Sequence, residues 1–129
     1  MQFNGYHHVG LFALDAQKSL DFYTRGLGGK MVFSFPMLED TSKIIYLVDM
    51  GGNAVIEIIP KGNGEDELNA HWAHLAIRTD DSKAAYDLAI KAGAVSKMEP
   101  KEVKLGTMDA YISFVYGPDQ EVIEFFQVL

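Results

Sequence analysis

The sequence predicts an α+β fold made of two tandem βαβββ modules that form a curved mixed sheet. The prediction comes from a pattern that the 129-residue chain shows twice. His8 and His74 each stand near the start of an apolar, strand-like segment, and an aspartate follows each of them seven residues later, at Asp15 and Asp81. Each aspartate is placed to cap the helix that would follow the strand.

A pair of glutamates extends the repeat toward the end of each copy. Val55-Ile56-Glu57 in the first copy matches Val122-Ile123-Glu124 in the second, and the offsets from histidine to glutamate are 49 and 50 residues. The length suits one domain, 1–129, and each half of about sixty residues would be only marginally stable alone. We therefore expect modules at 6–60 and 72–129, joined by the polar, glycine-rich linker Lys61–Glu67.

The expected elements follow the same order in both copies. The first copy should contain a strand over 6–14, a helix over 16–26, and strands near 30–36, 43–50 and 53–60. The second should contain a strand over 72–79, a helix from 82 to Gly93, and strands near 94–98, 108–116 and 120–128, the last preceded by a turn at Gly117-Pro118-Asp119.

Composition and charge limit the classes of partner. A net charge of −7 argues against nucleic acid, whose phosphates need clustered lysine and arginine. No apolar run reaches the roughly twenty residues of a membrane span, and the first residues lack the features of a signal peptide. The chain has no cysteine, so disulfides and thiolate ligands are excluded. We expect a cytoplasmic protein with a small-molecule substrate.

The apolar neighbours of both glutamates predict that the carboxylates are buried. A buried carboxylate without a partner costs several kcal/mol, so each needs a cation or a proton. Arg25 and Arg78 are the only arginines that could serve as counter-ions. Two separate structural ion pairs are one solution. The more economical one is a single divalent metal ion bound by two imidazoles and two carboxylates, those of His8, Glu57, His74 and Glu124.

Three motifs resemble the vicinal oxygen chelate superfamily, and within it the glyoxalase I (lactoylglutathione lyase) group. They are His7-His8-Val9-Gly10-Leu11, the segment Ser19–Tyr23 with Leu27-Gly28, and Tyr116–Asp119 followed by Val122-Ile123-Glu124. The resemblance covers essentially the whole chain and implies the glyoxalase/bleomycin-resistance/dioxygenase-like fold. It places the family's metal quartet on the same four residues, and it implies nickel or cobalt first, with zinc, manganese or iron as other metals.

The resemblance also implies a reaction and an assembly. The implied enzyme is a metal-dependent lyase or isomerase that converts a hemithioacetal, or a similar α-hydroxycarbonyl compound, through an enediolate. Glu124 is the first choice for the catalytic base and Glu57 the second. Glyoxalase-like relatives imply a homodimer, with metal sites either within one chain or shared between two.

Two departures leave the substrate open. Glutathione-using relatives have arginine where this chain has Phe12, and commonly asparagine where it has Lys61. One alternative is an epimerase that acts next to a thioester, although methylmalonyl-CoA epimerases generally carry glutamine at the position of Glu57. The other is a small-molecule binding protein without turnover, similar to antibiotic-resistance members of the superfamily.

Overall fold

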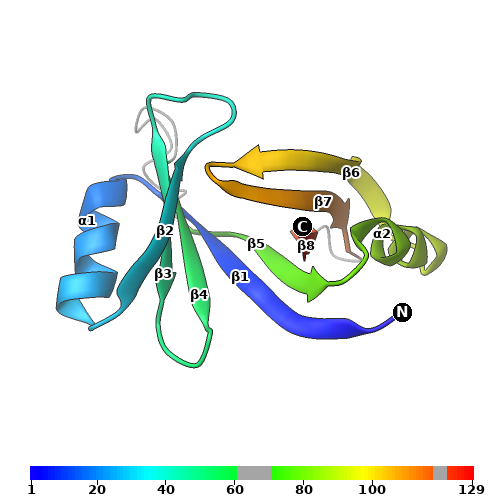
Figure 1. Ribbon diagram of the computed structural model, residues 1–129, viewed down its shortest axis with the longest axis horizontal. Helices are drawn as coiled ribbons and strands as arrows, with labels where there is room; N and C mark the ends of the chain where they lie inside the picture. Colours follow the sequence, from blue (N-terminus) through cyan, green and yellow to red (C-terminus); the bar gives the residue numbers. More distant parts are fainter. Residues whose placement is uncertain (61–70, 118–121) are drawn as a thin grey trace. The chain divides into compact units, whose positions relative to one another are not determined.

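The computed structural model describes residues 1–60, 71–117 and 122–129. The expected linker at 61–67, and Pro118 and Asp119 of the last expected turn, lie outside these ranges. The elements are, in chain order, β1 (Phe3–Ala13), α1 (Ala16–Asp21), the π-helical turn η1 (Phe22–Gly26), β2 (Lys30–Pro36), β3 (Ile44–Asp49), β4 (Val55–Pro60), β5 (His71–Thr79), α2 (Ser82–Lys91), β6 (Val95–Leu105), β7 (Met108–Tyr116) and β8 (Val122–Val128) (Figure 1). Neither described helix is long enough and apolar enough to cross a lipid bilayer.

The chain divides into two compact units, and the N-terminal unit contains His8–Ala73. Its strands lie in the order β2-β3-β4-β1, with β1 parallel to β4 and the other neighbours antiparallel. Helix α1 lies against this sheet (Figure 1). The apolar side chains between them form one core, made of Ala13, Val48 and Ile58 with Ala16, Leu20, Tyr23, Tyr46, Met50 and Ile56 around them.

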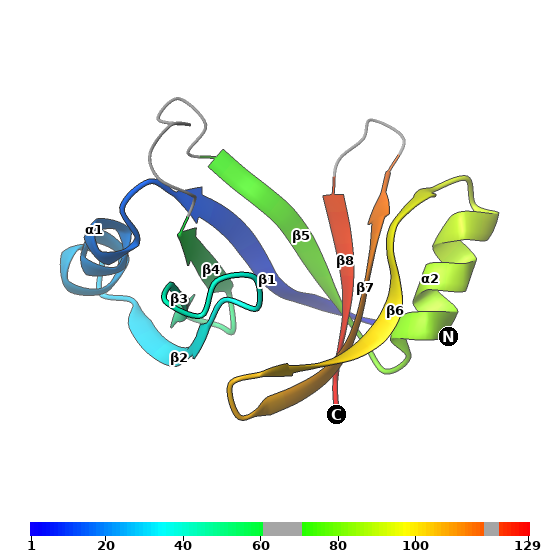
Figure 2. The same cartoon turned by 90° about the horizontal axis from the view of Figure 1, so that it is seen from above.

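The C-terminal unit combines His74–Leu129 with Met1–His7. Its strands lie in the order β6-β7-β8-β5, with β5 parallel to β8 and the other neighbours antiparallel. Helix α2 runs alongside this sheet (Figure 2), over a core of Ala85, Val115 and Phe125 with Ile77, Tyr86, Ala89, Ala94 and Ile123. The first residues of β1 pack here through aromatic rings, because Phe3 stacks on Phe125 and His7 on Phe126, with ring centroids 6.1 and 3.9 Å apart.

The two units therefore share one topology, and the predicted α+β class with two βαβββ modules is confirmed. The likeness extends to an irregularity in each outer strand. The register of β2 against β3 shifts between Met31 and Phe33, and that of β6 against β7 shifts between Ser96 and Met98. An extra residue at this point bends the strand and strengthens its twist. The repeat seen in the sequence is thus also a repeat of backbone geometry.

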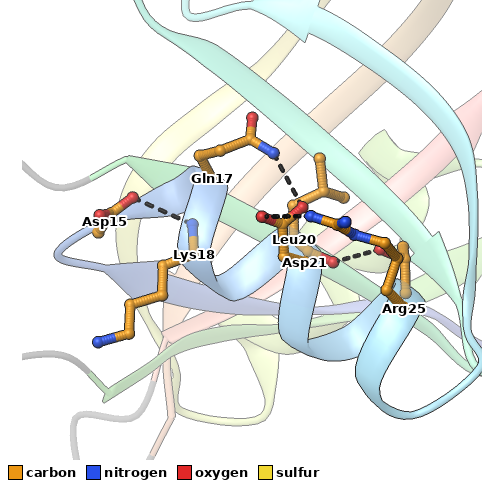
Figure 3. A network of polar contacts seen from close by, with 7 residues as sticks. Asp15, Gln17, Lys18, Leu20, Asp21 and Arg25 are labelled. Atoms are coloured by element: carbon orange, nitrogen blue, oxygen red, sulfur yellow. Dashed lines mark hydrogen bonds and ion pairs between the residues drawn. The ribbon is translucent and has the colours of Figure 1, made fainter.

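Both helices begin as predicted, at capping aspartates. The Asp15 carboxylate accepts a hydrogen bond from the Lys18 backbone N–H at 3.0 Å (Figure 3), and the Asp81 carboxylate accepts one from the Ala84 N–H at 2.9 Å. Such a bond satisfies one of the N–H groups that the first helical turn leaves without a partner. Figure 3 also shows Asp21 accepting from Gln17 and pairing with Arg25, both one helical turn away.

The first helical segment covers the predicted range 16–26. Its α-helical part ends at Asp21, and the segment continues to Gly26 as the π-helical turn η1. Gly29 lies just beyond this turn, and its N–H donates to the Tyr23 carbonyl at 2.8 Å. A Cβ at Gly29 would lie 2.6 Å from the same carbonyl oxygen. The π-helical turn therefore brings the backbone of Gly29 so close to the Tyr23 carbonyl that only glycine fits at position 29.

Strand β6 is longer than predicted. The sequence indicated a strand near 94–98, whereas β6 continues to Leu105 and forms a hairpin with β7. Pro100 lies within β6, and proline is tolerated in an outer strand because its missing N–H need not remove a hydrogen bond to a neighbouring strand. The register is irregular between Met98 and Lys101, on either side of this proline.

Candidate functional site

The N-terminal unit brings His8 and Glu57 together on neighbouring parallel strands. The imidazole Nε2 of His8 lies 3.6 Å from the carboxylate Oε1 of Glu57, and the side chains are only 1% and 11% exposed. In the register of β1 and β4, Val9 lies opposite Ile56 and Gly10 opposite Glu57. Gly10 has no side chain, so the position beside Glu57 is open to the imidazole from two residues earlier on β1.

The C-terminal unit repeats this arrangement with His74 and Glu124. Nε2 of His74 lies 3.1 Å from Oε1 of Glu124, and the side chains are 10% and 4% exposed. Leu75 lies opposite Ile123 and Ala76 opposite Glu124, so a small residue again stands beside the glutamate, two positions after the histidine. In both units, a histidine Nε2 therefore lies close to a glutamate Oε1 at the same position in the register of two parallel strands.

Both pairs lie on the sheet face that the helix does not cover. Ile56 and Ile58 belong to the core under α1, and Glu57 between them must point to the opposite face of β4. Ile123 and Phe125 belong to the core under α2, which places Glu124 on the opposite face of β8 by the same alternation. Each unit thus uses one face for packing and the other to present a histidine and a glutamate.

Neither arginine is the counter-ion of a buried glutamate. Arg25 pairs with Asp21 at 3.2 Å on the surface, where both side chains are well exposed. Arg78 forms no ion pair or hydrogen bond with any residue in the described part of the chain. Within its own unit, each buried carboxylate instead contacts a histidine. Histidine binds a metal ion when it is neutral and forms an ion pair with a carboxylate when it is protonated.

The separations within each pair fit ligands of one metal ion. Two ligand atoms bound at about 2.1 Å lie about 3.0 Å apart at a right angle and about 3.4 Å apart at a tetrahedral angle. The observed distances of 3.1 and 3.6 Å are close to these values. His8, Glu57 and His74 each present an atom that could bind a metal ion. Imidazole nitrogen and carboxylate oxygen without sulfur suit divalent nickel, cobalt, zinc, manganese or iron.

Apolar side chains surround the two glutamates in their sheets. Leu47 lies beside Glu57 on β3, and Phe114 lies beside Glu124 on β7. The Phe114 ring also meets the His74 imidazole edge to face, with centroids 5.7 Å apart. These neighbours exclude water from part of each pair, which strengthens the electrostatic interaction between its members.

A buried hydroxyl pair next to Glu124 was missed by the sequence analysis. Ser82, the first residue of α2, and Ser113 of β7 are both fully buried, with their Oγ atoms 2.9 Å apart. The Ser82 hydroxyl also donates to the Phe125 carbonyl at 2.8 Å. This network fixes α2 and β7 to β8 one residue away from Glu124. The only sequence signal is a serine inside the apolar segment Ile112-Ser113-Phe114.

Comparisons with known proteins show the family to which the chain belongs. A model of the Glyoxalase/Bleomycin resistance protein/Dioxygenase superfamily matches residues 5–125. The chain is 33% identical over 123 residues to a probable lactoylglutathione lyase of Vibrio cholerae, covering 93% of this chain and 88% of that protein.

Two solved structures have a similar fold. Methylmalonyl-CoA epimerase from Mycobacterium tuberculosis has a TM-score of 0.76 at 21% identity, covering 97% of this chain and 88% of that one. The Mn(II)-bound glyoxalase from Novosphingobium aromaticivorans has a TM-score of 0.69 at 17% identity, covering 95% of this chain and 37% of that one. With the family match and the Vibrio relative, the conclusion is that this chain belongs to the Glyoxalase/Bleomycin resistance protein/Dioxygenase superfamily.

Proposed function

We propose that the protein is a metal-dependent lyase or isomerase of the glyoxalase I type. Its metal site would contain one divalent ion bound by His8, Glu57, His74 and Glu124. The observation that carries the proposal is the repeated register, in which each unit pairs one buried histidine with one buried glutamate through Nε2 and Oε1. One ion would satisfy both carboxylates, for which neither arginine serves as the counter-ion.

The chemistry divides between the metal and the glutamates. A bound divalent ion acts as a Lewis acid, which stabilises the negative charge that develops on a substrate oxygen during proton abstraction. Glu124 removes the proton from one substrate carbon and returns it to the neighbouring carbon. His8 and His74 hold their glutamates in place, and the apolar neighbours Leu47 and Phe114 keep water from competing for the proton.

The proposed substrate is a hemithioacetal or a similar α-hydroxycarbonyl compound. Support comes from the Vibrio relative and from a lactoylglutathione lyase of Neisseria meningitidis that is 30% identical over 93% of this chain. An epimerase that acts next to a thioester would use the same proton chemistry, and the fold of methylmalonyl-CoA epimerase is similar. Glu57 favours the glyoxalase type, because those epimerases generally have glutamine there.

The test compares both reactions in one metal-controlled preparation. Protein stripped with a chelator should lose isomerisation of the hemithioacetal of methylglyoxal, and nickel or cobalt should restore more activity than zinc, manganese or iron. The same samples are assayed for solvent-deuterium exchange next to the thioester of methylmalonyl-CoA. Exchange into the thioester without hemithioacetal turnover would indicate the epimerase. Metal binding without either reaction would indicate a binding protein.

We also propose a homodimer, in which the two histidine–glutamate pairs meet either within one chain or between two chains. Mixing a His8→Ala variant with a Glu124→Ala variant distinguishes these arrangements. If sites are shared, hybrid dimers contain one intact quartet and regain metal binding. If metal binding does not return although the subunits exchange, each site lies within one chain. A monomer in light scattering at micromolar concentration would contradict the dimer.

A further inference from the structure

The strand β1 changes from one face of the sheet to the other near Gly5. Phe3 stacks on Phe125 with ring centroids 6.1 Å apart, and His7 stacks on Phe126 with centroids 3.9 Å apart. Consecutive residues of a strand point to opposite faces, so the two phenylalanines of β8 lie on different faces. Residues four positions apart in a regular strand share one face. The stretch from Phe3 to His7 therefore contains one extra residue, and Gly5 has the positive φ of 78° that is typical of such a bulge.

The peptide between Asn4 and Gly5 lies at this bulge and is exposed to solvent. Both residues are exposed, and the side chain of Asn4 forms no hydrogen bond with the residues that the structure describes. A Cβ atom built on Gly5 would meet no other atom within 4 Å. Since a bulge interrupts the regular hydrogen-bond ladder, the peptide has both the room and the freedom to change conformation.

An asparagine followed by a glycine can react with its own backbone. The glycine nitrogen loses its proton and attacks the asparagine Cγ, forming a bond to that carbon, and the side-chain nitrogen leaves as ammonia. Water then opens the resulting succinimide ring at either carbonyl carbon. One opening gives aspartate, and the other gives isoaspartate, in which the main chain runs through the former side chain. The net change consumes one water and releases one ammonia. Glycine favours the attack because no Cβ shields its nitrogen.

We propose that Asn4 is a site of spontaneous deamidation, and that its isoaspartate product releases the first residues of β1 from the C-terminal unit. Isoaspartate adds one carbon atom to the main chain between Phe3 and His7. Both rings are held in stacks, so the longer chain displaces at least one of them. The contact of 3.8 Å between the Thr79 hydroxyl and Met1 Sδ depends on the same segment. The new carboxylate also adds a negative charge to a chain whose net charge is already −7.

The test follows the purified protein during storage in warm, mildly alkaline buffer. Mass spectrometry measures the conversion of each asparagine amide to an acid after tryptic digestion, and protein L-isoaspartyl methyltransferase with labelled S-adenosylmethionine detects isoaspartate. The digest separates the relevant sites, with Asn4 in peptide 1–18, Asn53 in 44–61 and Asn63 in 62–78. Asn53 is the internal control, because it is also exposed but precedes Ala54, whose Cβ hinders the attack.

Asn4 should deamidate faster than Asn53 by roughly tenfold or more, with isoaspartate in peptide 1–18. Stored wild-type protein should then unfold at a lower urea concentration than fresh protein and exchange more backbone amide hydrogens over residues 1–7. The matched variant is Asn4→Gln, which keeps the amide but needs a larger and less favourable ring to react. Stored Asn4→Gln should change less in both measurements. Asn63 precedes a glycine and lies outside the described residues, and its conversion is common to both proteins and cancels in this comparison.

The inference is overturned if Asn4 in the folded protein converts no faster than Asn53. It is also overturned if Asn4 becomes isoaspartate while stored wild type and stored Asn4→Gln have the same unfolding midpoint and the same hydrogen exchange over residues 1–7. Neither measurement uses the proposed reaction, so both outcomes are independent of the proposed function.

Discussion

Replacing Ser113 with alanine removes one member of the buried hydroxyl pair that joins α2 to the strands of the C-terminal unit. The Ser113 and Ser82 Oγ atoms are 2.9 Å apart, and Ser82 also donates to the Phe125 carbonyl at 2.8 Å. Ser113→Ala loses the hydroxyl contact, together with the long bond of 3.4 Å from the Ser113 hydroxyl to the Ser82 carbonyl, but leaves Ser82 bonded to Phe125. Ser82→Ala loses both bonds of the Ser82 hydroxyl and keeps the backbone carbonyl. The two variants therefore remove overlapping parts of one network.

The expected changes in the free energy of unfolding follow from counting these bonds. A typical hydrogen bond contributes about 1 kcal/mol, so Ser113→Ala should destabilise the protein by about 1 kcal/mol and Ser82→Ala by about 2 kcal/mol. The double variant should also lose about 2 kcal/mol, because the shared bond is lost once. The coupling energy in a double-mutant cycle is then about 1 kcal/mol.

Urea unfolding, followed by far-ultraviolet circular dichroism, measures the free energy of unfolding of the wild type, the two single variants and the double variant. Ser42→Ala is the control, because its hydroxyl donates to Asp40 at 2.6 Å on an exposed loop, and its loss should change stability by less than about 0.5 kcal/mol. A coupling energy within error of zero would show that the two buried serines act independently. That result would refute the role assigned to the network in fixing α2 to β7 and β8.

Two further changes test the catalytic assignment and the packing of the N-terminal unit. Glu124→Gln should keep the fold and lose substrate proton exchange by roughly a hundredfold or more, and Glu57→Gln should lose less; the opposite order would exchange their roles. Gly29→Ala should lower the free energy of unfolding by about 1–3 kcal/mol, because the new Cβ would lie 2.6 Å from the Tyr23 carbonyl oxygen. Gly26→Ala, whose nearest contacts are at 3.8 Å, is its control in urea unfolding and should be nearly neutral.

The features that could be predicted from the sequence are those set by local and repeated patterns. The α+β class with two modules followed from the matched positions of His8 and His74, and the helix starts followed from Asp15 and Asp81. These predictions hold in the folded protein because strand alternation and N-terminal capping depend on only a few neighbouring residues. The pairing of each histidine with a glutamate then follows from the parallel register.

Features that depend on distant residues could not be predicted. The π-helical turn η1 depends on the close approach of Gly29 to Tyr23 and Val48, and the sequence shows only a glycine cluster. The extent of β6 depends on its pairing with β7, which overrides the turn propensity around Pro100. The metal site was predicted from both glutamates together, and its assembly from the two units stays a prediction.

Metal stoichiometry tests the central claim most directly. Elemental analysis should find about one divalent ion per chain in the wild type and almost none in His8→Ala or in His74→Ala, because each histidine belongs to the same proposed site. His7→Ala is the control, since His7 stacks on Phe126 and should not affect metal content. Two ions per chain, of which each variant loses one, would indicate two separate sites. A wild type without metal that matches both variants would show that the histidine–glutamate pairs are structural, and would contradict the account.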